Sequence, residues 1–254
     1  MTVIAIADRR PNQTASKAAS AVDPCTGCTV GKLSLCDALD AEGRKRFKPM
    51  VRGQALEPHQ MLFQEGDAAE HVYTVTSGQV SLARSLPDGR RQIVDFAGPG
   101  DFLGLSLGLE EPVTHRLSAE ALTQSRVCRL PRAAFNRLMQ DEPALSRRAL
   151  EFAARRIRAS QEQQLSLGRK TAAERVASFL VDMAERNLAR GGNASPLSLP
   201  MTRADIADHL GLTLETVSRA FSRLRKLGLI KLEGADRVAI PNLDALSSET
   251  AQSA

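Results

Sequence analysis

Four cysteines are the residues of this chain whose type and spacing most directly indicate chemistry. Cys25, Cys28 and Cys36 fall within twelve residues, and Cys128 lies far from them in the sequence. The only early apolar stretch, residues 3–7, is short and lacks preceding basic residues, so we expect no export signal. In a reducing compartment, clustered thiols indicate a metal site or a redox pair before a disulfide framework. Four thiolates suit either a [4Fe–4S] cluster or a structural zinc ion.

The pair Cys25 and Cys28 also matches the Cys-x-x-Cys motif of disulfide oxidoreductases. That motif begins a helix after a strand in a βαβ unit, whereas 24 residues without regular periodicity precede this pair. The sequence shows no Ser/His/Asp triad, phosphate-binding loop or paired-carboxylate pattern, so we expect a protein that is not an enzyme. The histidines are scattered, and we interpret each as structural or solvated: His59, His71, His115 and His209.

A second group of side chains, near the carboxyl end, has the pattern of a helix-turn-helix. Thr202 and Asp205 form a capping-box pattern at the start of a first helix. Gly211 permits a sharp turn, and Thr213 can cap a second helix over residues 214–227. Two helices joined by a short turn containing glycine form the arrangement that many proteins use to read DNA.

The outward face of the second helix carries side chains suited to reading bases. Glu215, Ser218 and Arg219 lie at i, i+3 and i+4, in the N-terminal half that enters the major groove in such motifs. Arg219 can donate two hydrogen bonds to guanine O6 and N7, and Glu215 can accept one from cytosine N4. The alternative is an ordinary surface helix with a Glu–Arg pair. The candidate DNA-binding residues are Thr213, Glu215, Thr216, Ser218, Arg219 and, as phosphate contacts, Arg223, Arg225 and Lys226.

Length and composition indicate two globular domains that would position these groups. The chain has 254 residues, of which 43% are hydrophobic and 25% are charged. No apolar run reaches the roughly 18 residues that a membrane span needs, so we expect a cytoplasmic protein without membrane contact. The net charge is +5. Residues 144–226 hold 15 Lys/Arg against 8 Asp/Glu, which makes nucleic acid a plausible partner for this half.

Turn residues and apolar periodicity divide the chain into segments. Between 49 and 142, short apolar runs alternate with glycine-containing turns about every ten residues, as in an all-β barrel or sandwich. The remaining segments are expected to be a disordered N-terminus (1–24), a cysteine-rich segment (25–48), a long helix (143–168), a DNA-binding domain (169–245) and a flexible tail (246–254).

The long helix is expected to end at Gly168 and to form a dimer interface. Leu150, Ala154 and Ile157 lie at i, i+4 and i+7, which gives a narrow apolar stripe between arginines. A stripe this narrow suits pairing with another helix better than burial in a core.

The run from Gly211 to Arg219 resembles the recognition unit of the CRP/FNR family of transcription regulators. Glu215-Thr216-Val217-Ser218-Arg219 is similar to the Glu-x-x-Ser-Arg signature of the FNR branch, and the resemblance extends over about residues 25–245. It implies an α+β fold with a double-stranded β-roll sensor domain, a long dimerisation helix and a C-terminal winged helix-turn-helix. It also implies an activator that binds, as a homodimer, a TTGAT-N4-ATCAA-like inverted repeat in double-stranded DNA, with RNA polymerase as a partner. Arg219 would then contact the guanine, Glu215 its paired cytosine, and Ser218 a thymine.

The resemblance also bears on what the sensor domain detects. Cyclic-nucleotide-binding members carry a Glu for the ribose and an Arg for the phosphate, whereas Leu105 and His115 stand at the matching positions here. We therefore expect no cyclic AMP binding, because the ribose hydroxyl would lose its partner. Oxygen-sensing FNR proteins hold a [4Fe–4S] cluster with three N-terminal cysteines and one in the β-roll. The resemblance implies that role for Cys25, Cys28, Cys36 and Cys128, with a spacing similar to that of alphaproteobacterial relatives; a structural zinc or a thiol-redox switch is the alternative.

Overall fold

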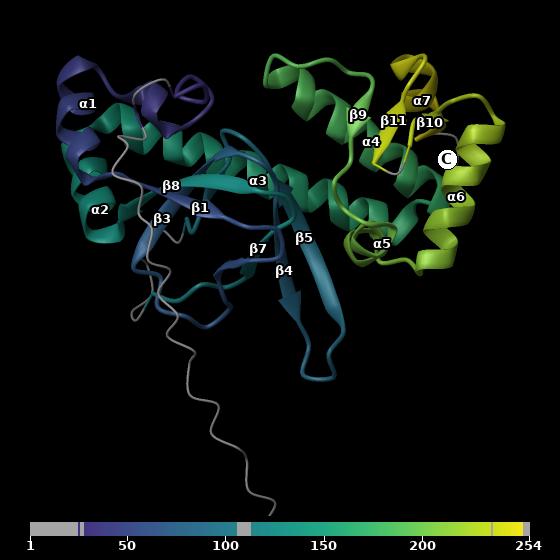
Figure 1. The fold of residues 1–254 in the computed structure, drawn as a ribbon, viewed down its shortest axis with the longest axis horizontal. Coiled ribbons are helices and arrows are strands. Elements are labelled where there is room, and N and C mark those ends of the chain that lie inside the picture. Colours follow the sequence, from purple (N-terminus) through teal and green to yellow (C-terminus); the bar gives the residue numbers. More distant parts are fainter. Residues whose placement is uncertain (1–24, 26–27, 106–112, 235, 251–254) are drawn as a thin grey trace, which may run out of the picture.

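The computed structural model describes residues 25, 28–105, 113–234 and 236–250 of the chain. The expectation of disorder for residues 1–24 lies outside this part. From the N-terminus, a short helical segment leads into a sheet domain, and helices dominate the second half (Figure 1). None of the helices within the described residues is both long and apolar enough to cross a membrane.

The strands of the sheet domain form two four-stranded antiparallel sheets, in the orders β1-β8-β3-β6 and β2-β7-β4-β5. Leu56, Val75 and Val127 point inward between the sheets and are almost completely buried, as the alternation of side chains along a strand allows. This arrangement confirms the expected β-roll. The strands are β1 (Arg52–Leu56), β2 (Met61–Phe63), β3 (His71–Ser77), β4 (Val80–Ser85), β5 (Arg91–Ala97), β6 (Phe102–Leu103), β7 (Ser118–Ala121) and β8 (Ser125–Pro131).

Helices at the N-terminal side pack against the start of the longest helix. A hydrophobic cluster joins Leu35 and Leu39 to Leu145, Ala149 and Phe152 of the long helix. The short helices are η1 (Leu35–Ala38), α1 (Ala41–Phe47) and η2 (Lys48–Met50), and they are followed after the β-roll by α2 (Arg132–Asp141) and the long helix α3 (Pro143–Arg169).

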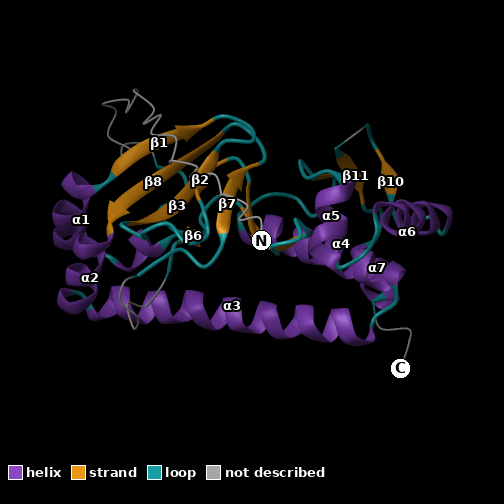
Figure 2. Cartoon of the chain, turned by 90° about the horizontal axis from the view of Figure 1, so that it is seen from below, coloured by secondary structure: helices purple, strands orange, loops and turns teal. Residues whose placement is uncertain are grey.

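Helix α3 runs alongside both the β-roll and the C-terminal helices (Figure 2). It ends at Arg169, so the expectation that Gly168 terminates it was wrong. A glycine within a helix costs only about 1 kcal/mol, and α3 tolerates it. The helix stops because Lys170 is extended and Thr171 starts a new capping box with Glu174.

The C-terminal half is a winged helix-turn-helix, as expected. Residues 246–249 belong to its last helix and Leu246 is completely buried, so the expected flexible tail does not begin at 246; residues 251–254 lie outside the described part. The elements are α4 (Ala172–Ala189), β9 (Leu197–Ser198), α5 (Arg203–Leu210), α6 (Leu214–Lys226), β10 (Lys231–Leu232), β11 (Arg237–Ala239) and α7 (Leu243–Glu249). The strands pair in the order β10-β11-β9.

The β-roll and the C-terminal half share one hydrophobic cluster. Ile93 and Phe96 of β5 are buried in it, and the Phe96 ring meets the edge of Phe179 on α4 at a centroid distance of 6.0 Å. Three arginines connect the same surfaces through ion pairs. Arg186 Nη1 lies 2.8 Å from Asp95 Oδ1, Arg190 Nη2 lies 2.6 Å from Asp101 Oδ2, and Arg91 Nη2 lies 2.5 Å from Asp205 Oδ1.

Candidate nucleic-acid interface and cysteine site

The helix-turn-helix is built from local capping interactions that the sequence predicts. The side chain of Asp205 accepts hydrogen bonds from Thr202 N at 2.9 Å and from Thr202 Oγ1 at 2.7 Å. Burial opposes the charge of Asp205, but these bonds and Arg91 outweigh it and lower the pKa of the carboxyl. Gly211 follows in the left-handed region with φ of 62°, where a side chain would be strained. Thr213 Oγ1 then accepts from Thr216 N at 3.2 Å and starts α6.

Helix α6 is fixed by its inner face and exposes its outer face. Val217 and Leu224 are fully buried, and Phe221 nearly so. Glu215, Ser218, Arg219, Arg223, Arg225 and Lys226 are all exposed. Among the predicted contact residues on this helix, Thr216 alone is half-buried, and the other six share its solvent face.

Hydrogen bonds within α6 leave most of its outward side chains available. Ser218 Oγ donates to Leu214 O at 2.9 Å, and Arg219 Nη2 reaches Thr216 Oγ1 at 3.4 Å. Arg223 Nη2 lies 3.7 Å from Glu249 of α7. Exposed side chains held by such weak contacts can turn toward a ligand at little cost.

One outward residue of α6 was missed from the sequence. Ser222 lines a shallow groove on α6 together with Ser218 and Arg219. It stands seven residues after Glu215, so the helical period alone places it on the same face. The Glu-x-x-Ser-Arg signature ends at Arg219, one turn before Ser222, and therefore gives no signal for it.

The structure brings the four cysteines to one pocket. Three of them enter from the segment around η1, and Cys128 enters from β8, where it pairs with Gly53 of β1 and Thr74 of β3. Cys28 is exposed and the other three are half-buried. Most of the remaining lining is apolar: Val30, Leu35, Leu39, Phe47, Val51, Val72, Phe102, Leu130, Phe135 and Leu145.

The segment that carries three cysteines is held in place by η1. Ser34 Oγ accepts from Cys36 N at 3.2 Å and donates to Gly31 O at 3.1 Å. Burial raises the pKa of the Cys36 thiol, and Cys28 adds to the effect, against the hydrogen bond from Ser34. Within the described residues, no three His, Cys, Asp or Glu side chains stand close enough together to hold a single metal ion.

A second pocket inside the β-roll contains the two positions that differ from cyclic-nucleotide binders. Leu105 and His115 line it with Arg116 and Arg132. The His115 ring lies flat on Phe63 at a centroid distance of 3.7 Å. Burial, and then the charge of Arg132, lower the pKa of His115 to about 4. His115 is therefore a neutral stacked ring at neutral pH, which is a poor substitute for an arginine facing a phosphate.

The apolar stripe of α3 faces solvent in the single chain. Leu150 is 60% exposed and Ile157 is 59% exposed, and Ala154 between them is half-buried. The two large side chains are separated by about two helical turns along one face.

Comparisons with known proteins match the chain over most of its length. Residues 54–142 match the cyclic nucleotide-binding domain, and residues 174–249 match the Crp-like helix-turn-helix domain. The chain is 40% identical to the nitrogen fixation regulation protein FixK of Bradyrhizobium diazoefficiens, over 82% of this chain and 86% of that protein. It is 38% identical to the transcriptional activatory protein AadR of Rhodopseudomonas palustris, over 88% and 92% respectively. The solved structure of FixK2 from Bradyrhizobium japonicum superposes with a TM-score of 0.74 at 37% identity, over 80% of this chain and 99% of that one.

Proposed function

This chain belongs to the CRP/FNR family of transcription regulators, and from that premise we propose that it activates genes under low oxygen as a [4Fe–4S]-dependent dimer. As a member of this family it is a transcription regulator and not an enzyme. We place its action in the cytoplasm, where its DNA target and RNA polymerase are.

The DNA-binding half of the proposal rests on the exposed face of α6. In a TTGAT-N4-ATCAA-like repeat, Arg219 contacts the guanine of each half-site through both guanidinium nitrogens, and Glu215 accepts from the paired cytosine. Ser218 contacts a thymine. Arg223, Arg225 and Lys226 lie toward the other end of the helix, where contacts go to phosphates.

A dimer is needed to read an inverted repeat, because each recognition helix reads one half-site. We assign the interface to Leu150, Ala154 and Ile157. Two copies of α3 that pair through this stripe remove large exposed apolar side chains from water. The small Ala154 allows the two helices to approach closely between the larger residues.

The observation that carries the sensor half is the shared pocket of the four cysteines. A [4Fe–4S] cluster takes one thiolate on each iron. The pocket fits this requirement, because it is mostly apolar, opens at the exposed Cys28 and is lined by Cys25, Cys28, Cys36 and Cys128. When bound, a [4Fe–4S] cluster would supply reactivity toward oxygen. The thiolates on both sides of the pocket would tie the η1 segment to β8.

The η1 segment also touches the dimer helix, which gives the cysteines a route to DNA binding. Leu35 and Leu39 pack on Leu145, Ala149 and Phe152 at the start of α3. When the η1 segment is held against β8, this end of α3 keeps its packing and its stripe stays aligned for pairing. When the segment is released, the dimer weakens by the few kcal/mol that a change of helix packing can supply.

We propose no role for cyclic AMP. The pocket in the β-roll offers Leu105 at the ribose position and the neutral, stacked His115 near the phosphate position. A ribose hydroxyl buried there without a partner loses about 1–3 kcal/mol.

The test is one preparation of the full chain purified without oxygen, followed by an absorption spectrum and a gel shift with a TTGAT-N4-ATCAA duplex. We expect a broad visible band at about 400 nm that bleaches in air, together with DNA binding that falls as the band bleaches. A colourless protein with one zinc per chain would favour a structural zinc. A colourless, metal-free protein whose binding responds to a thiol reductant would favour a thiol-redox switch. Either result would overturn the oxygen-sensing proposal.

A further inference from the structure

A single side chain, Arg175 of α4, joins the carboxyl ends of two other helices. Its Nε donates to Lys170 O at 3.1 Å and its Nη2 to Leu167 O at 2.7 Å, both at the end of α3. Its Nη1 donates to Leu210 O at 3.0 Å, at the end of α5. Carbonyls at helix ends lack partners within the helix and carry partial negative charge. One guanidinium therefore satisfies three such carbonyls and lies at the negative ends of two helix dipoles.

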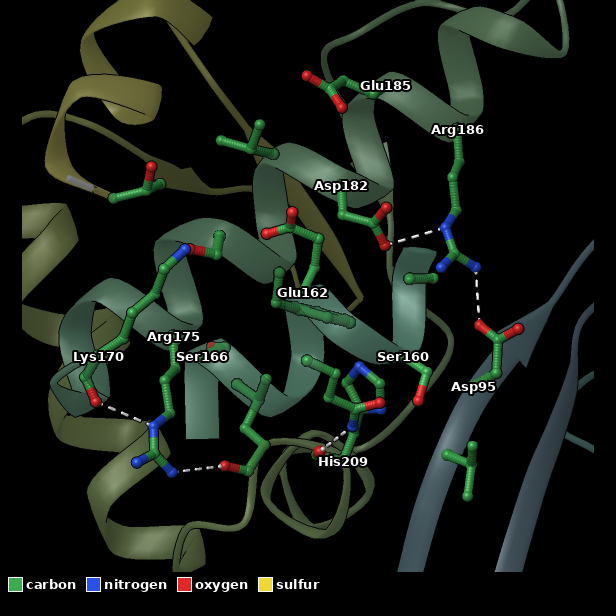
Figure 3. A pocket seen from close by; sticks show the side chains of 18 of the residues that line it. Asp95, Ser160, Glu162, Ser166, Lys170, Arg175, Asp182, Glu185, Arg186 and His209 are labelled. Atoms are coloured by element: carbon green, nitrogen blue, oxygen red, sulfur yellow. Dashed lines mark hydrogen bonds and ion pairs between the residues drawn. The ribbon is translucent and has the colours of Figure 1, made fainter. Parts of the chain in front are cut away.

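The carboxyl end of α5 is also bound by the β-roll and by α3. His209 O accepts from Gln163 Nε2 of α3 at 3.1 Å and from Gln92 Nε2 of β5 at 3.0 Å. The His209 ring turns back to Ile93 O of β5 at 3.0 Å. The last two residues of α5 thus contact the sensor domain, the dimer helix and α4. Figure 3 shows Arg175 and His209 in the pocket where these elements meet.

The turn to the recognition helix starts at this same point. Gly211 follows Leu210 directly, and a Cβ at Gly211 would lie 3.1 Å from Leu167 Cδ2 of α3. The backbone of the turn therefore lies against the end of the dimer helix. Helix α6 begins three residues later, at Leu214, so a shift at the end of α5 moves α6 with it.

We infer that Arg175 is a positioning residue that fixes the angle between the dimer helix and the recognition helix, with Gln163 as its helper. The inference rests on the proposed function, since that angle matters only when two α6 helices must meet two half-sites at once. It assigns Arg175 no contact with DNA. Its role is to set the distance and rotation between the two recognition helices of the dimer.

The spacing between half-sites measures this property directly. Adding or removing one base pair between half-sites rotates one of them by about 34° and moves it by about 3.4 Å. A dimer with rigidly held recognition helices tolerates this poorly, whereas a dimer with loosened helices tolerates it well. A general loss of stability would weaken binding to all spacings alike and would leave the preference unchanged.

The experiment measures anaerobic binding of the full chain to duplexes with TTGAT half-sites separated by two to six base pairs. Arg175→Met keeps an unbranched apolar stem and removes all three hydrogen bonds, and Arg175→Lys retains the charge without the fork. Arg169→Met is the matched control, because Arg169 is an exposed arginine at the same end of α3. Thermal unfolding and sedimentation report on the fold and the dimer.

We expect the wild type and Arg169→Met to lose about tenfold or more in affinity when the four-base-pair spacing changes by one. Arg175→Met should bind the four-base-pair duplex about tenfold more weakly than the wild type does, as the loss of charged hydrogen bonds implies. Its affinities for the duplexes with three and five base pairs should lie within about threefold of its affinity for the four-base-pair duplex. Arg175→Lys should lie between the two.

Gln163→Leu keeps the test decisive if Arg175→Met does not fold, because Gln163 is a half-buried side chain with one bond to α5. It should flatten the spacing preference in the same direction, by a smaller factor. A sharp preference in the wild type that a folded Arg175→Met or Gln163→Leu dimer retains in full would overturn the inference. A wild type that binds no duplex at all would instead refute the proposed function, and the inference would fall with it.

Discussion

Replacing Ile157 by glutamate should separate the dimer. Ile157 is 59% exposed in the single chain, which corresponds to roughly 100 Å² of apolar surface available for burial, and a symmetric contact counts it twice. At about 25 cal/mol per Å², the two side chains contribute on the order of 5 kcal/mol to association. This energy corresponds to a dimer dissociation constant weakened by about 10³-fold to 10⁴-fold. Two carboxylates facing each other across the symmetry axis add to the cost.

The assay is sedimentation velocity without oxygen at micromolar concentration, with the cluster content measured on the same sample. The wild type should sediment as a dimer and Ile157→Glu as a monomer with an unchanged visible spectrum, because Ile157 faces solvent and is not part of the cluster that packs on η1. Leu188→Glu is the control, since Leu188 is a comparably exposed leucine on α4 and outside the stripe. If Ile157→Glu sediments like the wild type, the interface lies on another surface and the area argument fails.

Three further substitutions test the other assignments. Arg219→Ala should cost about 1–3 kcal/mol per half-site in a gel shift and should remove discrimination at the guanine only; an equal loss for all four base pairs would make Arg219 a phosphate contact. Cys128→Ser should abolish both the visible band and anaerobic DNA binding, and retention of either would exclude Cys128 as the fourth ligand. The pKa of His115 is lowered to about 4 in the folded chain. As the pH falls below about 6.5, His115 is therefore protonated in the unfolded chain and stays neutral in the folded chain. Stability should therefore fall by about 3 kcal/mol as the pH drops from 6.5 to 4, in urea unfolding, and His115→Gln should show a shallower fall; an identical pH profile would contradict the buried, neutral ring.

The parts of the site that depend on neighbours in sequence could be predicted well. Thr202 and Asp205 are three residues apart, and Gly211 and Thr213 flank one turn, so backbone geometry alone relates them. The structure has each of these caps where the pattern places it. The β-roll strands follow from the same kind of local evidence, turns separated by short apolar runs.

The parts that depend on distant segments could not be predicted from spacing. Arg91 pairs with Asp205 and Asp208 more than a hundred positions away, and no local period relates them. The convergence of Cys128 with Cys25, Cys28 and Cys36 came from the family resemblance, since a strand and a remote loop can meet in many ways. The end of α3 was predicted wrongly at Gly168 for a different reason. A glycine lowers the stability of a helix without necessarily ending it, and the packing of the surrounding turn determines where the helix ends.

The shared hydrophobic cluster between β5 and the C-terminal helices limits how this protein can be recombined with its relatives. A chimaera cut between α3 and α4 would join the DNA-binding half to a foreign β5. The foreign strand would lack Ile93 and Phe96, which pack beside Phe179. It would also lack Arg91, which would leave Asp205 and Asp208 without their cation. Such a hybrid would expose apolar surface on both sides of the joint. The unit of exchange is therefore the C-terminal half together with the β4–β5 hairpin, and changes in β5 and α5 are expected to be inherited as pairs.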